Sequence, residues 1–334
     1  MHSCWTCEAG VEPAATLEQG VGPVKDLALD HSRTLAHDPA LARRDACASC
    51  RGPHLTPTTI DNPSLLRRMV RGARLAFHRG PAGRWIERQR QLRATRAWTS
   101  DDEAMRAFYA GFVRAGDLVF DVGANVGSRT KVFLRLEARV VAVEPQPACA
   151  DLLARAFARE PRVTIVREAL GREPGAAEMR LSDASTISSM SEGWIAAVRG
   201  SGRFTQYHWD RSVTVPVTTL DRLIQRVGRP RFIKIDVEGF EREVLEGLSA
   251  SVPALSFEFT PEWLESTFAC VAHLESLGMR QFNYSLGESM RLERADWLAG
   301  SELRACLLAL RGDTRVFGDV YARAQTASGA GGRA

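Results

Sequence analysis

The stretch Asp121-Val122-Gly123-Ala124-Asn125-Val126-Gly127-Ser128-Arg129-Thr130 decides the fold. It begins at the end of an apolar run, residues 118–122, of the kind found in strands that are covered on both faces, and a helical pattern follows it. Its glycines allow a tight turn and a close approach of the backbone to a ligand. A strand, a glycine-rich turn and a helix in this order predict a doubly wound, mostly parallel sheet, whose ligands bind at the carboxyl ends of the strands.

The turn differs from a dinucleotide-binding turn. Asn125 stands where the Gly-x-Gly-x-x-Gly pattern has its second glycine, and Asp121 places an acid at the end of the strand. An acid there repels a pyrophosphate but can accept a hydrogen bond from an ammonium group, and free N–H groups of the turn can hold a carboxylate. The amino-acid end of S-adenosylmethionine carries both groups. A nicotinamide-dependent oxidoreductase is the alternative, and the glycine pattern and the lack of a Tyr-x-x-x-Lys pair disfavour it.

Two further segments carry acids at the ends of predicted strands. Glu144, before Pro145, ends the second strand 21 positions after Gly123, where an acid can accept hydrogen bonds from both ribose hydroxyls. The segment 232–241 places Lys234, Asp236 and Glu238 at alternate positions, so a strand would present them on one face. A lysine buried in a central strand needs an acidic partner, and Asp236 is the obvious one.

Strands and helices are expected to alternate from residue 117 onward. Further buried strands are predicted over residues 139–144, 163–167, 231–237, 254–259, 279–284 and 315–321. Residues 177–181 and 213–217 predict hairpin or edge strands around an irregular insert, residues 182–212. Helices are predicted over 64–77, ending at Gly80-Pro81, and over 152–157, 218–224 and 241–248; others begin at Ser100 with a capping box and at Thr260-Pro261.

The motifs 121–130, Ala142-Val-Glu-Pro145, Thr219-Leu-Asp221, Lys234-Ile-Asp-Val-Glu-Gly-x-Glu241 and a strand ending in Glu258 resemble the FkbM family of S-adenosylmethionine-dependent methyltransferases. The resemblance covers about residues 100–322. It implies a class I methyltransferase fold, Rossmann-like, with a seven-stranded sheet whose last strand is antiparallel, and O-methylation of a hydroxyl on a polyketide, sugar or other small molecule. It also implies that the cofactor S-adenosyl-L-methionine contacts Asp121, Gly123, Ala124, Asn125, Gly127, Thr130, Glu144, Pro145, Glu168 and Ala169.

Methyl transfer to oxygen requires an aligned acceptor and removal of its proton. We expect Asp236 or Glu238 to be the base or to hold the hydroxyl, Lys234 to fix the carboxylate, and Glu258 to be an alternative base. These four are the predicted catalytic residues, and no metal is predicted among them. The aromatic insert 182–212 is expected to cover the acceptor site or to be an ordinary packed loop. His208, a lone loop histidine, has no assigned role.

Outside the predicted methyltransferase domain, residues 100–323, the chain has three other parts. Residues 1–62 form an extension in which Cys4/Cys7 and Cys47/Cys50 could bind zinc, form redox dithiols or bind nothing. Residues 63–99 form a basic helical segment, with ten arginines against one acid between 64 and 98. That segment is either a solvated helix face or a surface for an anion, an acidic lipid or a nucleic acid, which would make the protein a non-enzymatic binding module. Residues 324–334 are expected to be disordered.

The remaining expectations concern partners and location. A small-molecule or glycan acceptor is expected, nucleic acid is not, and the oligomeric state cannot be read from the sequence. The sequence has no apolar run of membrane-spanning length, and its seven cysteines are an odd number, which fits reduced thiols. We therefore predict a cytoplasmic protein.

Overall fold

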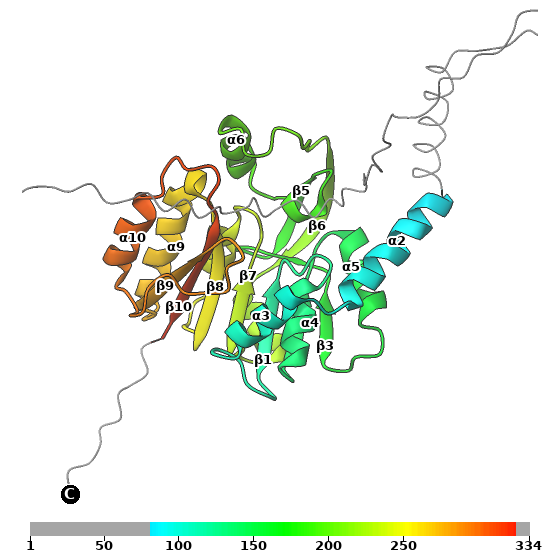
Figure 1. The fold of residues 1–334 in the computed structure, drawn as a ribbon, viewed down its shortest axis with the longest axis horizontal. Helices are drawn as coiled ribbons and strands as arrows, with labels where there is room; N and C mark the ends of the chain where they lie inside the picture. Colours follow the sequence, from blue (N-terminus) through cyan, green and yellow to red (C-terminus); the bar gives the residue numbers. More distant parts are fainter. Residues whose placement is uncertain (1–80, 325–334) are drawn as a thin grey trace, which may run out of the picture. The chain divides into compact units, whose positions relative to one another are not determined.

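The computed structural model describes residues 81–324 (Figure 1). The extension 1–62 with its cysteine pairs, the predicted helix 64–77 and residues 325–334 of the predicted disordered tail lie outside the described residues. Ala324, the first residue of that predicted tail, is ordered, because its amide donates to the carbonyl oxygen of Pro253. Within residues 81–324, no helix is both long enough and apolar enough to cross a membrane.

Seven strands form the main sheet in the order β3-β2-β1-β7-β8-β10-β9. All neighbours run parallel except β10, which is antiparallel to both β8 and β9. The bounds are β1 (Leu118–Val122), β2 (Arg139–Val143), β3 (Val163–Val166), β7 (Phe232–Ile235), β8 (Ala254–Phe259), β9 (Gln281–Leu286) and β10 (Gly318–Arg323). Every predicted main-sheet strand is present to within three residues at each end. The class I methyltransferase sheet that the resemblance implied is therefore confirmed.

Helices cover both faces of the sheet. One face packs against α3 (Ser100–Tyr109), α4 (Ser128–Arg135) and α5 (Pro147–Ala156), and the other against α7 (Leu220–Val227), α8 (Glu241–Glu246), α9 (Leu264–Ser276) and α10 (Gly300–Leu308). The central strands are apolar on both faces because each strand sends alternate side chains to each layer. Val119 and Phe232 face α3 and α4, while Phe120 and Ile233 face the layer of α7 to α10.

Three further strands form a smaller sheet that is separate from the main sheet, and the insert lies between two of these strands. β4 (Ala169–Leu170), β6 (Arg211–Thr218) and β5 (Gly175–Leu181) form a three-stranded sheet in that order, with β5 and β6 antiparallel. This confirms the hairpin that the sequence predicted. The insert between β5 and β6 contains a short 3-10 turn, η1 (Ser185–Ile187), and the helix α6 (Glu192–Gly200). Figure 1 shows α6, β5 and β6 together at the top of the view.

Two predicted helix caps are wrong, and one helix was not predicted. Pro81 is the first described residue and lies in α2 (Pro81–Arg96), which lies beside α5 (Figure 1); the predicted end of a helix at Gly80-Pro81 falls at residues outside those described. The cap of α3 is Thr99 with Asp102, one residue earlier than predicted. Thr260 precedes a 3-10 turn, η2 (Pro261–Trp263), and makes no side-chain cap. Helix α10 was not predicted; its nine residues have a weak apolar pattern and begin after Ala299 rather than after a capping residue.

Candidate active site

The glycine-rich loop joins β1 to α4 at the carboxyl end of β1. Gly123 and Gly127 have positive φ angles of 80° and 89°, and a Cβ on Gly123 would lie 1.8 Å from the carbonyl oxygen of Asp236. The loop backbone therefore touches the backbone that follows β7, and only glycine fits there. This contact joins the predicted cofactor loop directly to the predicted catalytic segment.

The N–H groups of this loop are largely used within the fold. The amides of Gly123 and Ala124 donate to the carbonyl oxygen of Val143, the amide of Gly127 donates to that of Ala124, and the amide of Asn125 donates to Oε2 of Glu144 at 2.8 Å. The prediction that free N–H groups of the turn hold a carboxylate is wrong for these four.

Asp121 is buried at the end of β1, beside Lys234 in the register of β1 and β7. Its Oδ2 accepts a hydrogen bond from Oγ1 of Thr130 at 2.6 Å. The Thr130 hydroxyl therefore orients the Asp121 carboxylate. Burial raises the pKa of Asp121 to about 6, against the Thr130 hydrogen bond and the charge of Arg129, which lower it. A cationic ligand group beside this carboxylate would favour its ionised form.

Glu144 lies buried at the tip of β2, followed by Pro145. Its two oxygens accept hydrogen bonds from the amides of Asn125 and Gln146, at 2.8 and 2.7 Å. Burial raises its pKa to about 7, although both hydrogen bonds lower it. Because each carboxylate oxygen can accept more than one hydrogen bond, the side chain keeps acceptor capacity for a diol.

Two residues, Glu168 and Ala169, are predicted to lie near the adenine ring of the cofactor. Glu168 is half-buried, and its Oε2 accepts a hydrogen bond from Arg226 of α7 at 2.8 Å. Ala169 is buried in β4, at the start of the smaller sheet. Their role in cofactor binding stays a prediction.

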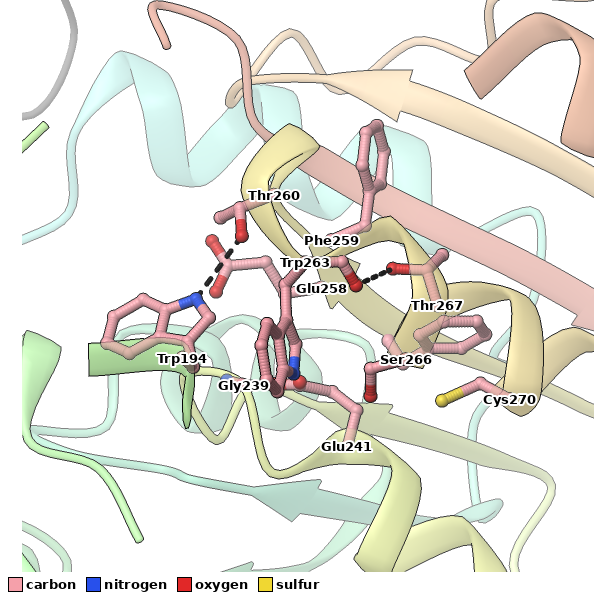
Figure 2. Close-up of a pocket in the computed structure, with 11 residues that line it drawn as sticks. Trp194, Gly239, Glu241, Glu258, Phe259, Thr260, Trp263, Ser266, Thr267 and Cys270 are labelled. Atoms are coloured by element: carbon pink, nitrogen blue, oxygen red, sulfur yellow. Dashed lines mark hydrogen bonds between the residues drawn. The ribbon is translucent and has the colours of Figure 1, made fainter. Parts of the chain in front are cut away.

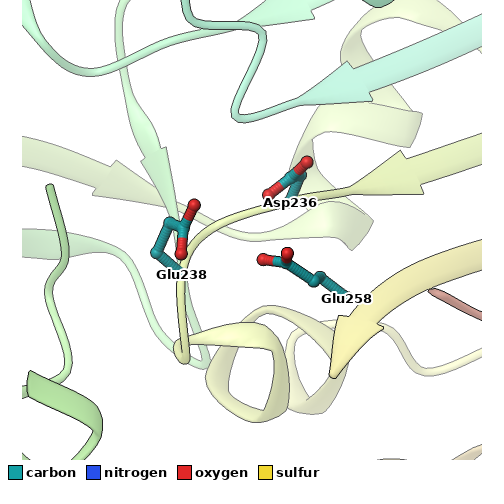
Figure 3. Close-up of side chains that lie close together, drawn as sticks. All are labelled: Asp236, Glu238 and Glu258. Atoms are coloured by element: carbon teal, nitrogen blue, oxygen red, sulfur yellow. The ribbon is translucent and has the colours of Figure 1, made fainter. Parts of the chain in front are cut away.

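Three carboxylates gather where β7 and β8 end. Oxygens of Asp236, Glu238 and Glu258 lie within 4.8 Å of one another, and Figure 3 shows the three side chains pointing toward a common centre. One cation could contact all three at this spacing. The strand alternation predicted for Glu238 is wrong, because β7 ends at Ile235 and Glu238 lies in a turn with a φ of 52°. It is this turn that brings Glu238 to the other two.

Lys234 is buried beneath this cluster and has a partner that the sequence did not predict. Its Nζ donates to Oδ1 of Asp319 at 2.9 Å and to Oδ2 of Asp236 at 3.4 Å. Burial would lower the pKa of Lys234, but the two carboxylates outweigh it and raise that pKa well above its ordinary value. Asp319 was missed because it lies 85 residues away, on β10 opposite Glu258. The sequence feature that could have indicated Asp319 is an acid in the interior of the predicted strand 315–321.

The insert packs onto the loop that carries these acids. Trp194 of α6 is buried against Gly239, where a Cβ would lie 2.2 Å from the indole, and its Nε1 donates to Oγ1 of Thr260. Oγ of Ser189 donates to the carbonyl oxygen of Glu238 at 2.6 Å. Together with Trp263 and Glu258, Trp194 and Thr260 line a small pocket (Figure 2).

An ion pair fastens the far end of the insert. The Arg203 guanidinium contacts Glu262 at 2.8 Å with both side chains nearly buried, and it also donates to the carbonyl oxygen of Val316. His208, by contrast, is exposed and lies 3.2 Å from Asp183. The insert is therefore anchored beside the acid cluster, and its histidine is exposed and makes its contact with Asp183.

Residues 121–286 match the Methyltransferase FkbM domain family. The glycine loop, Glu144, the acid cluster and the insert all fall within these residues, so this part of the chain is an FkbM methyltransferase domain. The FkbM resemblance that the motifs indicated is confirmed.

A curated relative and solved structures are similar to this chain. The hexuronic acid methyltransferase AglP of Haloferax volcanii is 30% identical over 143 residues, 42% of this chain and 54% of the relative, so the chain spans about half the length of that protein. Among solved structures, the precorrin-6y C5,15-methyltransferase of Geobacter metallireducens has a TM-score of 0.36 at 10% identity, covering 67% of this chain and 87% of that one. A SAM-dependent O-methyltransferase of Thermotoga maritima has a TM-score of 0.33 at 12% identity, covering 69% and 67%.

Proposed function

We propose that this protein transfers the methyl group of S-adenosyl-L-methionine to a hydroxyl oxygen of a sugar or another small polyol. One observation carries the proposal: within an FkbM domain, the glycine loop that would hold the cofactor touches the backbone of the acid cluster at Asp236. A methyl donor and an acceptor bound on either side of this contact would be neighbours, as direct displacement requires.

The residues at the first two strand ends fit this cofactor. Asp121 supplies a carboxylate for the ammonium group and Glu144 one for the ribose hydroxyls, and Gly123 leaves no side chain in the way. When bound, adenosylmethionine supplies a methyl group on a positively charged sulfur. The remaining predicted contacts are Ala124, Asn125, Gly127, Thr130, Pro145, Glu168 and Ala169.

The acid cluster would prepare the acceptor. Asp236 or Glu238 takes the proton of the attacking hydroxyl or orients that hydroxyl, and Glu258 is the alternative base. Lys234 holds the Asp236 carboxylate from below, at 3.4 Å. The three carboxylates can together accept hydrogen bonds from several hydroxyl groups, which supports a polyol rather than an apolar acceptor.

The acceptor class has one further indication. The relative from Haloferax volcanii is named for a hexuronic acid, so a glycan acceptor is the first to test. The insert would cover the acceptor, because Trp194 and Trp263 line the pocket beside Glu258 (Figure 2).

Two measurements test the proposed function. Calorimetry or thermal shift with adenosylmethionine, adenosylhomocysteine, NAD and NADP should show binding of the first two alone, since a ligand of the native state stabilises it according to concentration over Kd. Methyl-labelled adenosylmethionine is then incubated with glycosides of a hexuronic acid, a neutral hexose and an amino sugar, and with a hydroxylated polyketide. Binding of NAD without adenosylhomocysteine, or methyl transfer to none of these acceptors, would contradict the proposal.

We also propose a cytoplasmic location, which the odd number of cysteines supports. Fractionation of cells that produce the tagged protein tests it, and recovery with the membrane pellet or the external medium would contradict it.

A further inference from the structure

We infer that Arg129 binds the carboxylate of the cofactor's methionine part, and that Glu288 occupies part of this carboxylate site in the ligand-free protein. The inference rests on the proposed function and adds to it a residue that the motif comparison left unassigned. Four observations support it, from the loop, the position of Arg129, its unsatisfied donor and its partner.

The first observation is that four amides of the glycine loop are already used within the fold. The amides of Gly123, Ala124, Asn125 and Gly127 all donate to acceptors within the fold. Asp121 places a buried carboxylate at the head of the proposed cofactor site, at the end of the strand that leads into the loop. A cofactor carboxylate beside it would be repelled unless a cation compensates, because like charges a few ångströms apart are unfavourable.

The second observation is the position of Arg129. It is the second residue of α4, which begins directly after the loop, and its guanidinium is near enough to Asp121 to oppose the rise in the pKa of that carboxyl. The charge of Asp236 also acts on Arg129 and helps to raise its pKa, against the effect of burial, which lowers it. Arg129 therefore lies at the start of the helix that follows the loop and is close enough to Asp121 to interact with it electrostatically.

The third observation is an unsatisfied donor. The Nε atom of Arg129 is fully buried, and no acceptor in the described part of the chain takes its hydrogen. A buried N–H without a partner is unfavourable, so such a group indicates a ligand or an ordered water. A carboxylate oxygen of the cofactor would satisfy Nε and the adjacent edge of the guanidinium.

The fourth observation is that a carboxylate already uses part of the same edge. Both oxygens of Glu288 lie within 2.8 Å of Nη2 of Arg129, the terminal nitrogen on the same side of the guanidinium as Nε. Glu288 follows Gly287 in the loop after β9, far from the glycine loop in sequence, and the charge of Arg129 lowers its pKa although burial raises it. A cofactor carboxylate that binds Nε would therefore compete with Glu288 for Nη2.

The test compares two ligands that differ in the methionine part. Adenosylhomocysteine carries the carboxylate, and 5′-methylthioadenosine lacks the whole amino-acid head. Calorimetry is done with the wild type, Arg129→Gln and a matched control, Arg162→Gln, which removes an arginine paired with Glu160 just before β3, at the opposite end of the sheet. We expect Arg129→Gln to weaken adenosylhomocysteine at least 30-fold and methylthioadenosine less than threefold, and Arg162→Gln to weaken neither.

The outcomes separate this inference from the proposed function. Wild type that binds neither ligand contradicts the proposed function itself. Wild type that binds both, with Arg129→Gln losing less than threefold for adenosylhomocysteine or losing equally for the two ligands, overturns only the role of Arg129. Should Arg129→Gln fail to fold, Glu288→Gln decides: removing the competing charge should tighten adenosylhomocysteine severalfold and leave methylthioadenosine unchanged. Unchanged affinity for adenosylhomocysteine in that variant would overturn the inference.

Discussion

The two halves of the site are built in different ways. On the cofactor side, Asp121, the glycine loop and Glu144 lie within 24 residues, and Asp121 and Glu144 accept hydrogen bonds from Thr130, Asn125 and Gln146, all close in sequence. On the acceptor side, Lys234 pairs with Asp319, and Glu238 is held by Ser189, 85 and 49 residues away in sequence. Residues close in sequence thus form much of the cofactor side, whereas contacts between residues far apart in sequence assemble the acceptor side.

This difference has a consequence for mutations. On the cofactor side, a substitution changes backbone geometry and should remove binding. On the acceptor side, a substitution changes the position or charge of a carboxylate and should lower turnover while the cofactor still binds.

Gly123→Val should have the largest effect. Its Cβ would lie 1.8 Å from the carbonyl oxygen of Asp236, at a φ of 80° that valine does not adopt. We expect adenosylhomocysteine to bind at least 100-fold more weakly or not at all by calorimetry. The control is Gly175→Ala, where no atom lies within 4 Å of the new Cβ and which should bind normally. Normal binding by Gly123→Val would show that the contact between the two loops is not needed.

Asp236→Asn should lower turnover about 100-fold or more, the usual contribution of general acid–base catalysis. The Kd of adenosylmethionine should change less than threefold, because the substituted group lies on the acceptor side. Glu238→Gln and Glu258→Gln, assayed in parallel with an acceptor found by the methylation screen, identify the base as the variant with the greatest loss. Unchanged turnover of Asp236→Asn would reject its role.

Asp319→Asn should lower turnover about tenfold, since Lys234 then loses its closer partner and no longer holds Asp236 in place. The control is Asp102→Asn, because Asp102 also forms a largely buried pair with a lysine, Lys131, at 2.7 Å, but on α3. Both variants should unfold at lower denaturant concentration. Turnover per folded molecule should fall only in Asp319→Asn, and an equal fall in both would make Asp319 merely structural.

The stability of the ligand-free protein should decrease as the pH rises from about 5 to 8. Burial raises the pKa values of Asp121, Glu144 and Glu241 to about 6, 7 and 8, so the folded state binds more protons than the unfolded state in this range. The free energy of unfolding then falls with pH, by roughly 1–3 kcal/mol for each such group. Urea midpoints at several pH values measure this, and Glu144→Gln should flatten the curve while the exposed Glu178→Gln should not. A curve that rises with pH would contradict the prediction.

The same division explains what the sequence could predict. The main-sheet strands and the smaller hairpin follow from local apolar runs, and Asp121 and Glu144 follow from their positions at strand ends. The pair between Lys234 and Asp319 could not be predicted, because a register between strands far apart in sequence decides it. The position of Glu238 depends on a left-handed turn, and helix α10 depends on packing against α9 rather than on a capping residue.

The buried pair between Arg203 and Glu262 limits how the acceptor range of this protein could be re-engineered. The insert is not structurally independent, because Arg203 pairs with Glu262 in η2 and Trp194 donates to Thr260, just before η2. A chimera that receives residues 182–210 from another enzyme would leave Glu262 and Thr260 as buried acceptors without donors. Exchange of specificity would therefore require the transfer of the insert together with the segment around η2 that contacts it.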